Sequence, residues 1–116
     1  TGGTDTAPGA RAMHEIQGDW STRANQAKAP VGALVEFECP RGGTGGNVWG
    51  TDVYTDDSSI CEAAVHAGMI VRADGGIVRF ELLGAQPSFQ ASERHGVRSI
   101  DYPTWPGSFR FVAIEE

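Results

Sequence analysis

Three histidines are the residues of this 116-residue chain with the most obvious catalytic chemistry: His14, His66 and His95. A histidine that activates a nucleophile needs a positioned serine or cysteine and an orienting carboxylate. The serines nearest to His66 in sequence, Ser58 and Ser59, are expected to cap a helix instead. We therefore interpret His66 as a buried hydrogen-bonding residue, His95 as a turn residue with a backbone role and His14 as an exposed side chain. A hydrolase that uses His66 or His95 is the least favoured of the functions considered.

Three aspartates, Asp52, Asp56 and Asp57, could offer oxygen ligands to a cation. Calcium needs six or more oxygens, and their spacing does not match an EF-hand loop. Helix capping explains Asp56 and Asp57 without an ion, so we predict no metal and no cofactor, although a calcium ion near these residues stays open at this point. The glycine-rich stretch 42–46 lacks the Lys-Ser/Thr and helix of a phosphate-binding loop, so we interpret it as a plain loop.

Aromatic side chains near charged ones suggest a binding surface. Sugar-binding and other small-molecule sites combine an apolar or aromatic wall with a few fixed polar groups. The alternative is that the tryptophans and Tyr54 belong to the core and that Arg94 is solvated or locally paired. The predicted ligand-binding residues are Trp49, Tyr54, Asp56, Asp57, Arg94, His95 and Trp105.

Composition limits the possible partners. The net charge of −6 argues against nucleic acid and anionic membrane surfaces, and no apolar run is long enough for membrane insertion. The chain begins at Thr1 without a leader, which indicates a mature product or an excised piece. Arginine greatly outnumbers lysine, which suggests a GC-rich source genome and a bacterial origin.

Two cysteines, Cys39 and Cys61, leave two alternatives open. Neither belongs to a CxxC pair, which excludes a zinc-finger type of metal site. They either form a disulfide in an oxidising compartment or remain as two buried thiols.

The helix we expect over residues 58–67 is the central structural prediction. Ser59 and Glu62 fit a capping box at its start, and Gly68 fits a left-handed stop. Apart from Glu62 and His66, its body is apolar and rich in small residues, so it lacks the polar face of a surface helix. We therefore predict an α+β fold in which a single central helix is wrapped by antiparallel strands in small sheets.

Strands are predicted around this helix from period-two alternation. The predicted strands cover residues 31–39, 48–54 with a break at Gly50, and 109–114. Residues 69–72 and 77–83 are predicted to form a hairpin through Asp74-Gly75. Residues 1–12 are expected to be a flexible N-terminal tail, 13–26 has no clear pattern beyond an anchoring Trp20, and 13–116 is expected to be one domain.

The stretch from Trp49 to Gly68, WGTDVYTDDSSICEAAVHAG, resembles the LCCL domain family. Arg94-His95-Gly96-Val97-Arg98-Ser99 and Trp105-Pro106-Gly107-Ser108-Phe109 resemble two later motifs of that family, in the same order. The resemblance implies a helix packed among β-strands and a non-catalytic module of secreted, periplasmic or cell-surface proteins. It also implies a Cys39–Cys61 disulfide, because the family's other two cysteines are both missing from this divergent chain.

The function that we predict is binding of a glycan, a lipopolysaccharide or an extracellular protein. The alternative from another class is a structural or oligomerisation module of a larger extracellular assembly. The sequence leaves the oligomeric state and the ligand undetermined.

Overall fold

The computed structural model describes residues 13–114, so the predicted tail at 1–12 lies outside the described residues. These residues form an α-helix, a short 3₁₀ helix and eight strands. In chain order the elements are β1 (Met13–Ile16), η1 (Ala24–Ala27), β2 (Leu34–Cys39), β3 (Gly50–Thr51), β4 (Val53–Thr55), α1 (Ile60–His66), β5 (Gly76–Leu83), β6 (Glu93–Arg94), β7 (Val97–Arg98) and β8 (Ser108–Val112).

The main sheet has six strands in the order β1-β2-β5-β8-β4-β3, and β6 and β7 form a separate ribbon. All neighbours are antiparallel except β1 and β2. In β5 the alternate residues Val78, Phe80 and Leu82 are buried, which agrees with the period-two alternation that predicted a strand over residues 77–83. Phe80 lies opposite Val35 of β2 and Phe111 of β8, so the middle of the sheet carries the apolar face.

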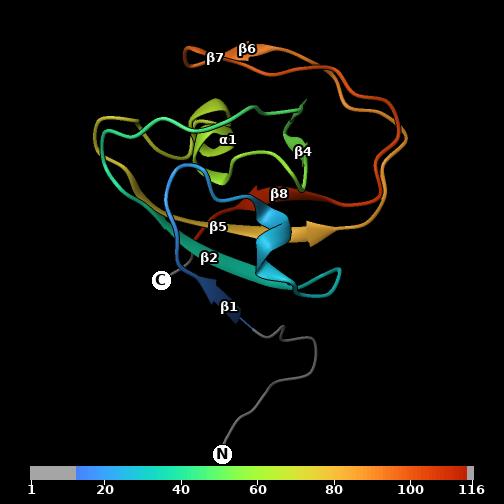
Figure 1. The fold of residues 1–116 in the computed structure, drawn as a ribbon, viewed down its shortest axis with the longest axis horizontal. Helices are drawn as coiled ribbons and strands as arrows, with labels where there is room; N and C mark the ends of the chain where they lie inside the picture. The colour runs from blue at the N-terminus through green and yellow to red at the C-terminus, as the bar shows by residue number, and fades with distance from the viewer. Residues whose placement is uncertain (1–12, 115–116) are drawn as a thin grey trace, which may run out of the picture.

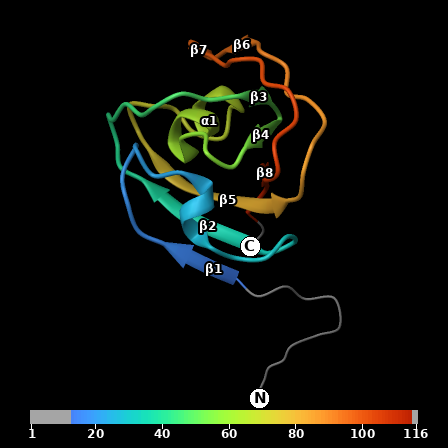
Figure 2. The same ribbon diagram turned by 45° about the vertical axis from the view of Figure 1, so that its right-hand side comes forward.

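Helix α1 lies between the two sheets (Figure 1). The strands β2, β5 and β8 pass on one side of it, and β6 and β7 lie on the other, an arrangement that the turned view also shows (Figure 2). All seven residues of α1 are buried, and Ala63 and Ala64 have no exposed surface. The predicted α+β fold with an enclosed central helix is therefore confirmed.

Both ends of α1 follow from local sequence. Ser59 Oγ accepts a hydrogen bond from the Glu62 backbone N–H at 3.2 Å, so the helix body begins at Ile60, two residues later than predicted. At the other end Gly68 has φ of +81°, and the N–H groups of Gly68 and Met69 donate to the carbonyls of Val65 and Ala64. This is a Schellman stop, in which glycine adopts the left-handed conformation that ends the helix.

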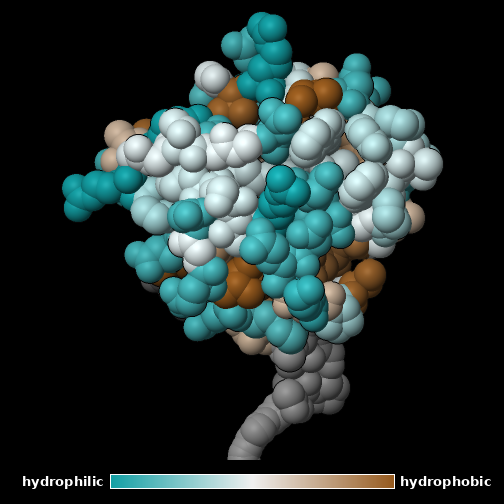
Figure 3. Space-filling model, viewed as in Figure 1, coloured by the Kyte–Doolittle hydropathy of each residue, from teal (hydrophilic) through white to brown (hydrophobic). Residues whose placement is uncertain are grey.

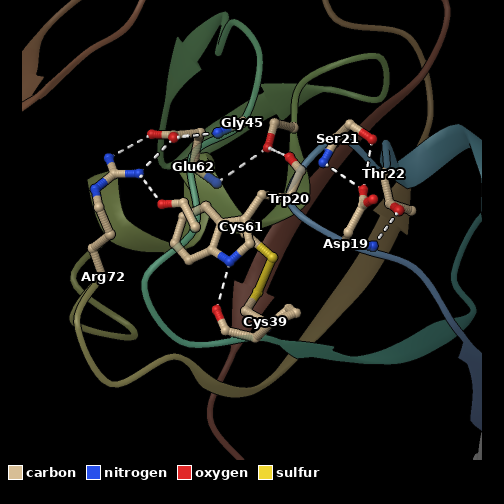
Figure 4. The surroundings of a disulfide bond; sticks show 12 residues. Asp19, Trp20, Ser21, Thr22, Cys39, Gly45, Cys61, Glu62 and Arg72 are labelled. Atoms are coloured by element: carbon tan, nitrogen blue, oxygen red, sulfur yellow. Dashed lines mark hydrogen bonds and ion pairs between the residues drawn. A yellow bond between two sulfur atoms is a disulfide. The ribbon is translucent and has the colours of Figure 1, made fainter.

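A disulfide joins Cys39 at the end of β2 to Cys61 in α1 (Figure 4). The two Cα atoms are 5.8 Å apart, and both side chains are buried. The indole of Trp20 covers this region and donates from Nε1 to Pro40 O at 2.5 Å. The disulfide and the docking of Trp20 are both confirmed, and together they hold the helix against the C-terminal end of β2.

The predicted hairpin around Asp74-Gly75 is wrong. Residues 69–72 form no strand, and the chain instead makes a tight turn in which Asp74 N–H donates to Val71 O. The positive φ angles fall on Gly75 and Gly76 rather than on Asp74. Strand β5 begins at Gly76 opposite Cys39, so its partner is the distant β2 and not the segment just before it.

Other boundaries also differ from the prediction: β2 begins at Leu34 rather than at residue 31, and β8 ends at Val112 rather than at residue 114. The break in the stretch 48–54 falls at Asp52, which has φ of +69° and turns β3 back onto β4, rather than at Gly50. Met13–Ile16, where no clear pattern was found, forms β1 by pairing in parallel with β2.

Candidate functional site

Three partly exposed aromatic rings, Trp49, Tyr102 and Trp105, contact one another in succession, and we call them the aromatic row. Tyr102 is in the middle, with its ring centroid 6.4 Å from that of Trp49 and 5.3 Å from that of Trp105, both nearly edge to face. All three side chains are half-buried. The row therefore presents partly open rings whose positions are fixed by each other.

Backbone pairing of the loop 84–107 holds the aromatic row in place. Trp105 and Gln86 exchange two backbone hydrogen bonds, and Tyr102 and Phe89 do the same. Trp49 forms a parallel bridge with Ile100, so the loop is tied to the start of β3 as well. Tyr102 and Trp105 thus stand on a long segment that is paired with itself at two points and with the start of β3 at a third.

Asp56 connects the aromatic row to the sheet. Its Oδ1 accepts a hydrogen bond from Trp105 Nε1 at 2.8 Å, and its backbone N–H donates to Gly107 O at 3.1 Å. The approach at Gly107 is so close that a Cβ there would overlap the Asp56 carboxylate. Asp56 therefore positions Trp105. The sequence had suggested that Asp56 caps α1, and the structure does not place it there.

A polar depression, which we call the polar cup, opens beside Trp49. Asp57 lies in its wall, and its Oδ1 accepts a hydrogen bond from Thr55 Oγ1 at 2.6 Å. The other polar residues of the cup could not be identified from the sequence, because their positions next to Trp49 arise only in the fold. The cup is lined by Ser21, Arg23, Asn47, Trp49, Asp57 and Ser59.

Tyr54 is not on this surface, which contradicts its predicted role in direct ligand contact. Its side chain is completely buried, and its hydroxyl lies 3.0 Å from His66 Nδ1. Burial raises the pKa of Tyr54 to about 12, so the hydroxyl stays protonated at pH 7 and donates a hydrogen bond to His66 Nδ1. The tyrosine was misassigned because the strand that carries it turns this residue toward α1.

His66 is fully satisfied within the core, as its sequence position suggested. Its Nε2 lies 3.2 Å from Ser92 O and 3.1 Å from Ser92 Oγ, and since a carbonyl can only accept, Nε2 carries the proton. Burial is the main cause that lowers the pKa of His66, so the ring is neutral at pH 7. Its other nitrogen faces a tyrosine and not a carboxylate, so the arrangement is not that of a serine hydrolase triad.

Arg94 and His95 lie at the opposite end of α1 from the polar cup. Arg94 Nη1 forms an exposed ion pair with Asp52 Oδ1 at 2.8 Å, and His95 Nδ1 lies 3.1 Å from His66 O, the last residue of the helix. His95 adopts φ of +52°, in agreement with the predicted turn role. The predicted binding set therefore splits: Trp49, Asp56, Asp57 and Trp105 come together, whereas Arg94 and His95 do not join them.

Glu62 forms an ion pair with Arg72 that could not be predicted from the sequence. Its carboxylate accepts hydrogen bonds from both terminal nitrogens of Arg72, at 2.6 and 2.8 Å, and from Gly45 N at 2.6 Å (Figure 4). Burial acts to raise the pKa of Glu62, but the hydrogen bonds from Arg72 and Gly45 outweigh it and hold this pKa below its usual range. The Arg72 guanidinium also lies 5.1 Å from the Trp20 ring centroid. The sequence signal for a buried partner of opposite charge was the single glutamate in an otherwise apolar helix. The structure shows that Glu62 forms an ion pair with Arg72 instead of completing a capping box with Ser59.

Asp52, Asp56 and Asp57 are the candidate metal ligands in the sequence. Within residues 13–114, no group of three or more His, Cys, Asp and Glu side chains is placed to hold a metal ion. Asp52, Asp56 and Asp57 instead contact Arg94, Trp105 and Thr55 respectively.

Comparison with known proteins identifies the family. Residues 17–109 match the sequence profile of the LCCL domain, which covers most of the chain and all of the sites described above. The chain belongs to the LCCL domain family. This LCCL domain is 37% identical over 95 residues to clotting factor C of Tachypleus tridentatus, covering 80% of the chain and 9% of that protein.

Two human relatives show similar identity over shorter stretches. Vitrin is 41% identical over 63 residues, or 54% of the chain and 9% of vitrin. Cysteine-rich secretory protein LCCL domain-containing 2 is 42% identical over 71 residues, or 60% of the chain and 14% of that protein. The LCCL domain thus spans about a tenth of the length of these relatives.

These relatives place the LCCL domain among secreted and extracellular proteins, so the predicted location is confirmed. Their LCCL domains are non-enzymatic modules, which agrees with the prediction that the chain is not an enzyme. In residues 13–114, no helix combines the length and hydrophobicity needed to cross a membrane. The relatives come from animals, so the predicted bacterial origin gains no support from them.

Proposed function

We propose that residues 13–116 act as one non-catalytic binding module of an extracellular protein, and that this module recognises a glycan, a lipopolysaccharide or a protein partner. The observation that carries the proposal is the aromatic row. Half-exposed tryptophan and tyrosine rings that are fixed before binding offer large contact area at a small entropic cost. Recognition sites of proteins and sugars use such rings with a few placed polar groups.

The buried polar residues support a binding function over a catalytic one. Tyr54 and His66 form hydrogen bonds within the core, and Glu62 forms an ion pair with Arg72, so these groups are not available to a substrate. Polar side chains with free hydrogen-bond donors and acceptors, by contrast, lie around Trp49 in the polar cup. Chemistry available to a ligand is therefore concentrated beside the aromatic row.

A second candidate function, oligomerisation, has its own supporting observation. Met69 and Val71 are exposed next to an apolar pocket that Val65, Gly68 and Ile70 help to line. On the face seen in Figure 3, hydrophobic residues form small separate patches among hydrophilic and near-neutral ones. That face therefore offers no broad apolar surface, and we place the candidate self-association surface at the Val71 region, where an apolar pocket and exposed apolar side chains lie together.

One set of variants separates the two candidates. The wild-type domain is immobilised and probed with a glycan array, with lipopolysaccharide and with extracellular-matrix proteins. For any partner that binds, Trp49→Ala and Tyr102→Ala are expected to reduce the affinity by about tenfold or more, as for central aromatic contacts. Val71→Ala is the matched control and should bind as the wild type does.

Unchanged partner binding in both aromatic variants would contradict the proposal. Light scattering over a range of concentrations tests the second candidate. A mass that rises with concentration in the wild type and not in Val71→Ala would favour oligomerisation.

A further inference from the structure

The polar cup contains side chains that have no partner within the protein. The Arg23 guanidinium and the Asn47 side-chain amide are exposed, and within residues 13–114 neither forms a hydrogen bond or ion pair. Because both side chains are exposed to water, their lack of a partner does not destabilise the fold. The guanidinium and the amide line the same depression as the Trp49 ring and are free to bind a ligand.

The walls of the cup are fixed by hydrogen bonds made elsewhere by the same residues. Asn47 O accepts from Ser59 N at 3.1 Å, and Trp49 N donates to Ser58 Oγ at 3.0 Å. Ser59 Oγ donates to Trp20 O at 2.7 Å, so the base of the cup is joined to the cap of α1. These bonds hold the backbones under Asn47 and Trp49 still, so little order has to be gained on binding.

The groups in the cup fit the donors and acceptors of adjacent sugar hydroxyls. A carboxylate accepts hydrogen bonds, a guanidinium donates them, and an amide side chain does both. Asp57, Arg23 and Asn47 supply one of each. The indole of Trp49 adds a flat apolar surface, which suits the C–H face of a pyranose ring.

Charge selects among sugars. Inside the cup the charges of Arg23 and Asp57 balance, while a further carboxylate, that of Asp19, accepts a hydrogen bond from the backbone N–H of the cup residue Ser21. The whole chain carries a net charge of −6. An anionic ligand would therefore meet a repulsive field, and a neutral one would not.

We propose that the polar cup binds a single uncharged pyranose unit of a glycan, stacked on Trp49 and hydrogen-bonded by Asp57, Asn47 and Arg23. This rests on the proposed function and names the ligand class for one part of the same surface. The aromatic row continues from Trp49 to Tyr102, and further units of a chain would lie along it.

The test is a titration of the ¹⁵N-labelled domain with the methyl pyranosides of glucose, mannose, galactose and N-acetylglucosamine, with methyl glucuronide as the anionic comparison. At least one neutral sugar should shift the Trp49 indole and the amides of residues 46–49 and 57–59, with a Kd of about 1–10 mM, typical of a single weak contact site. The glucuronide should bind at least about fivefold more weakly than its neutral counterpart, because of the negative field.

Two asparagines provide a matched pair of variants. Asn47→Ala should raise the Kd about fivefold or more, because one hydrogen-bonding group is lost. Asn25→Ala removes the same exposed side chain from η1, outside the cup, and should leave the Kd unchanged. Asp57→Asn tests the charge argument. Because it removes one negative charge from the cup, it should narrow the difference in Kd between the neutral sugar and the glucuronide.

Three results would overturn the inference: no shift with any neutral sugar up to about 50 mM, which is well beyond the expected Kd; binding of the glucuronide as strong as that of the best neutral sugar; or equal effects of Asn47→Ala and Asn25→Ala on the Kd. Failure here leaves the proposed function standing if Tyr102→Ala still weakens a glycan or protein partner found on the arrays. Loss of both effects would remove the two proposals together.

Discussion

Removal of the disulfide should destabilise the domain by an amount that can be worked out from its position. The bond closes a loop of sequence separation 22. The chain-entropy relation gives about 11 cal/mol/K for that loop, or about 3 kcal/mol at 25 °C. Because Cys39 and Cys61 are both buried, Cys39→Ala combined with Cys61→Ala also loses packing around two sulfur atoms, which adds about 1 kcal/mol.

Urea denaturation followed by circular dichroism measures this loss. The double variant should unfold at a midpoint about 2 M lower than the oxidised wild type, for a domain of this size. Reduction of the wild type should produce most of the same shift, whereas reductant should not affect the double variant. A difference below about 1 kcal/mol between the oxidised wild type and the double variant would refute the reasoning, because it would mean that the loop is already ordered in the unfolded chain.

Three more predictions concern α1. The pKa of His66 is lowered in the fold, so the unfolded chain binds more protons just below about pH 6.5; unfolding free energy should fall as pH drops through that value, and urea titrations of His66→Gln should lack this slope. The pKa of Glu62 is also lowered, so the stability that its ion pair provides is fully present above about pH 4.3 and is lost as pH falls through the lowered pKa of the folded state; Glu62→Gln should cost about 2 kcal/mol at pH 7 and progressively less as the pH falls below about 4, by the same assay. Gly68 has φ of +81° and a Cβ there would lie 2.9 Å from the His95 ring, so Gly68→Ala should lower thermal stability by about 1–2 kcal/mol. Gly84→Ala, where a Cβ meets open space, is its control and should change the melting temperature little; equal shifts for the two glycine variants would count against the strain argument.

The elements that could be predicted from the sequence are those whose signals are local. Ser59 and Gly68 mark the ends of α1, and the alternation of Val78, Phe80 and Leu82 marks the buried face of β5. The hairpin at Asp74-Gly75 could not be judged in this way, because β5 pairs with β2, which is more than thirty residues away in the register of Cys39 and Gly76. Pairing between distant strands leaves no mark in the sequence of the turn itself.

The candidate site was predicted in part, for a similar reason. Trp49 and Trp105 were identified from residue type and lie in one row, but Tyr102 between them was missed because its neighbours are set by the bridge to Phe89. Tyr54 has the same residue type and points inward to His66, which no local pattern could indicate. Residue type thus gave the kind of surface, and only the fold showed which aromatic rings share it.

The position of β8 has a consequence for how the chain is made. Residues Ser108–Val112 form the last strand of the described residues, yet they lie between β5 and β4 and join the two halves of the main sheet. During synthesis the earlier strands can leave the ribosome without finding this partner, so the sheet closes only after Val112 has emerged. Domains dominated by such distant pairing fold slowly. Until then the thiols of Cys39 and Cys61 have no completed sheet to hold them together, so oxidation and final folding should occur as one late step, and a chain cut before Ser108 should not reach either.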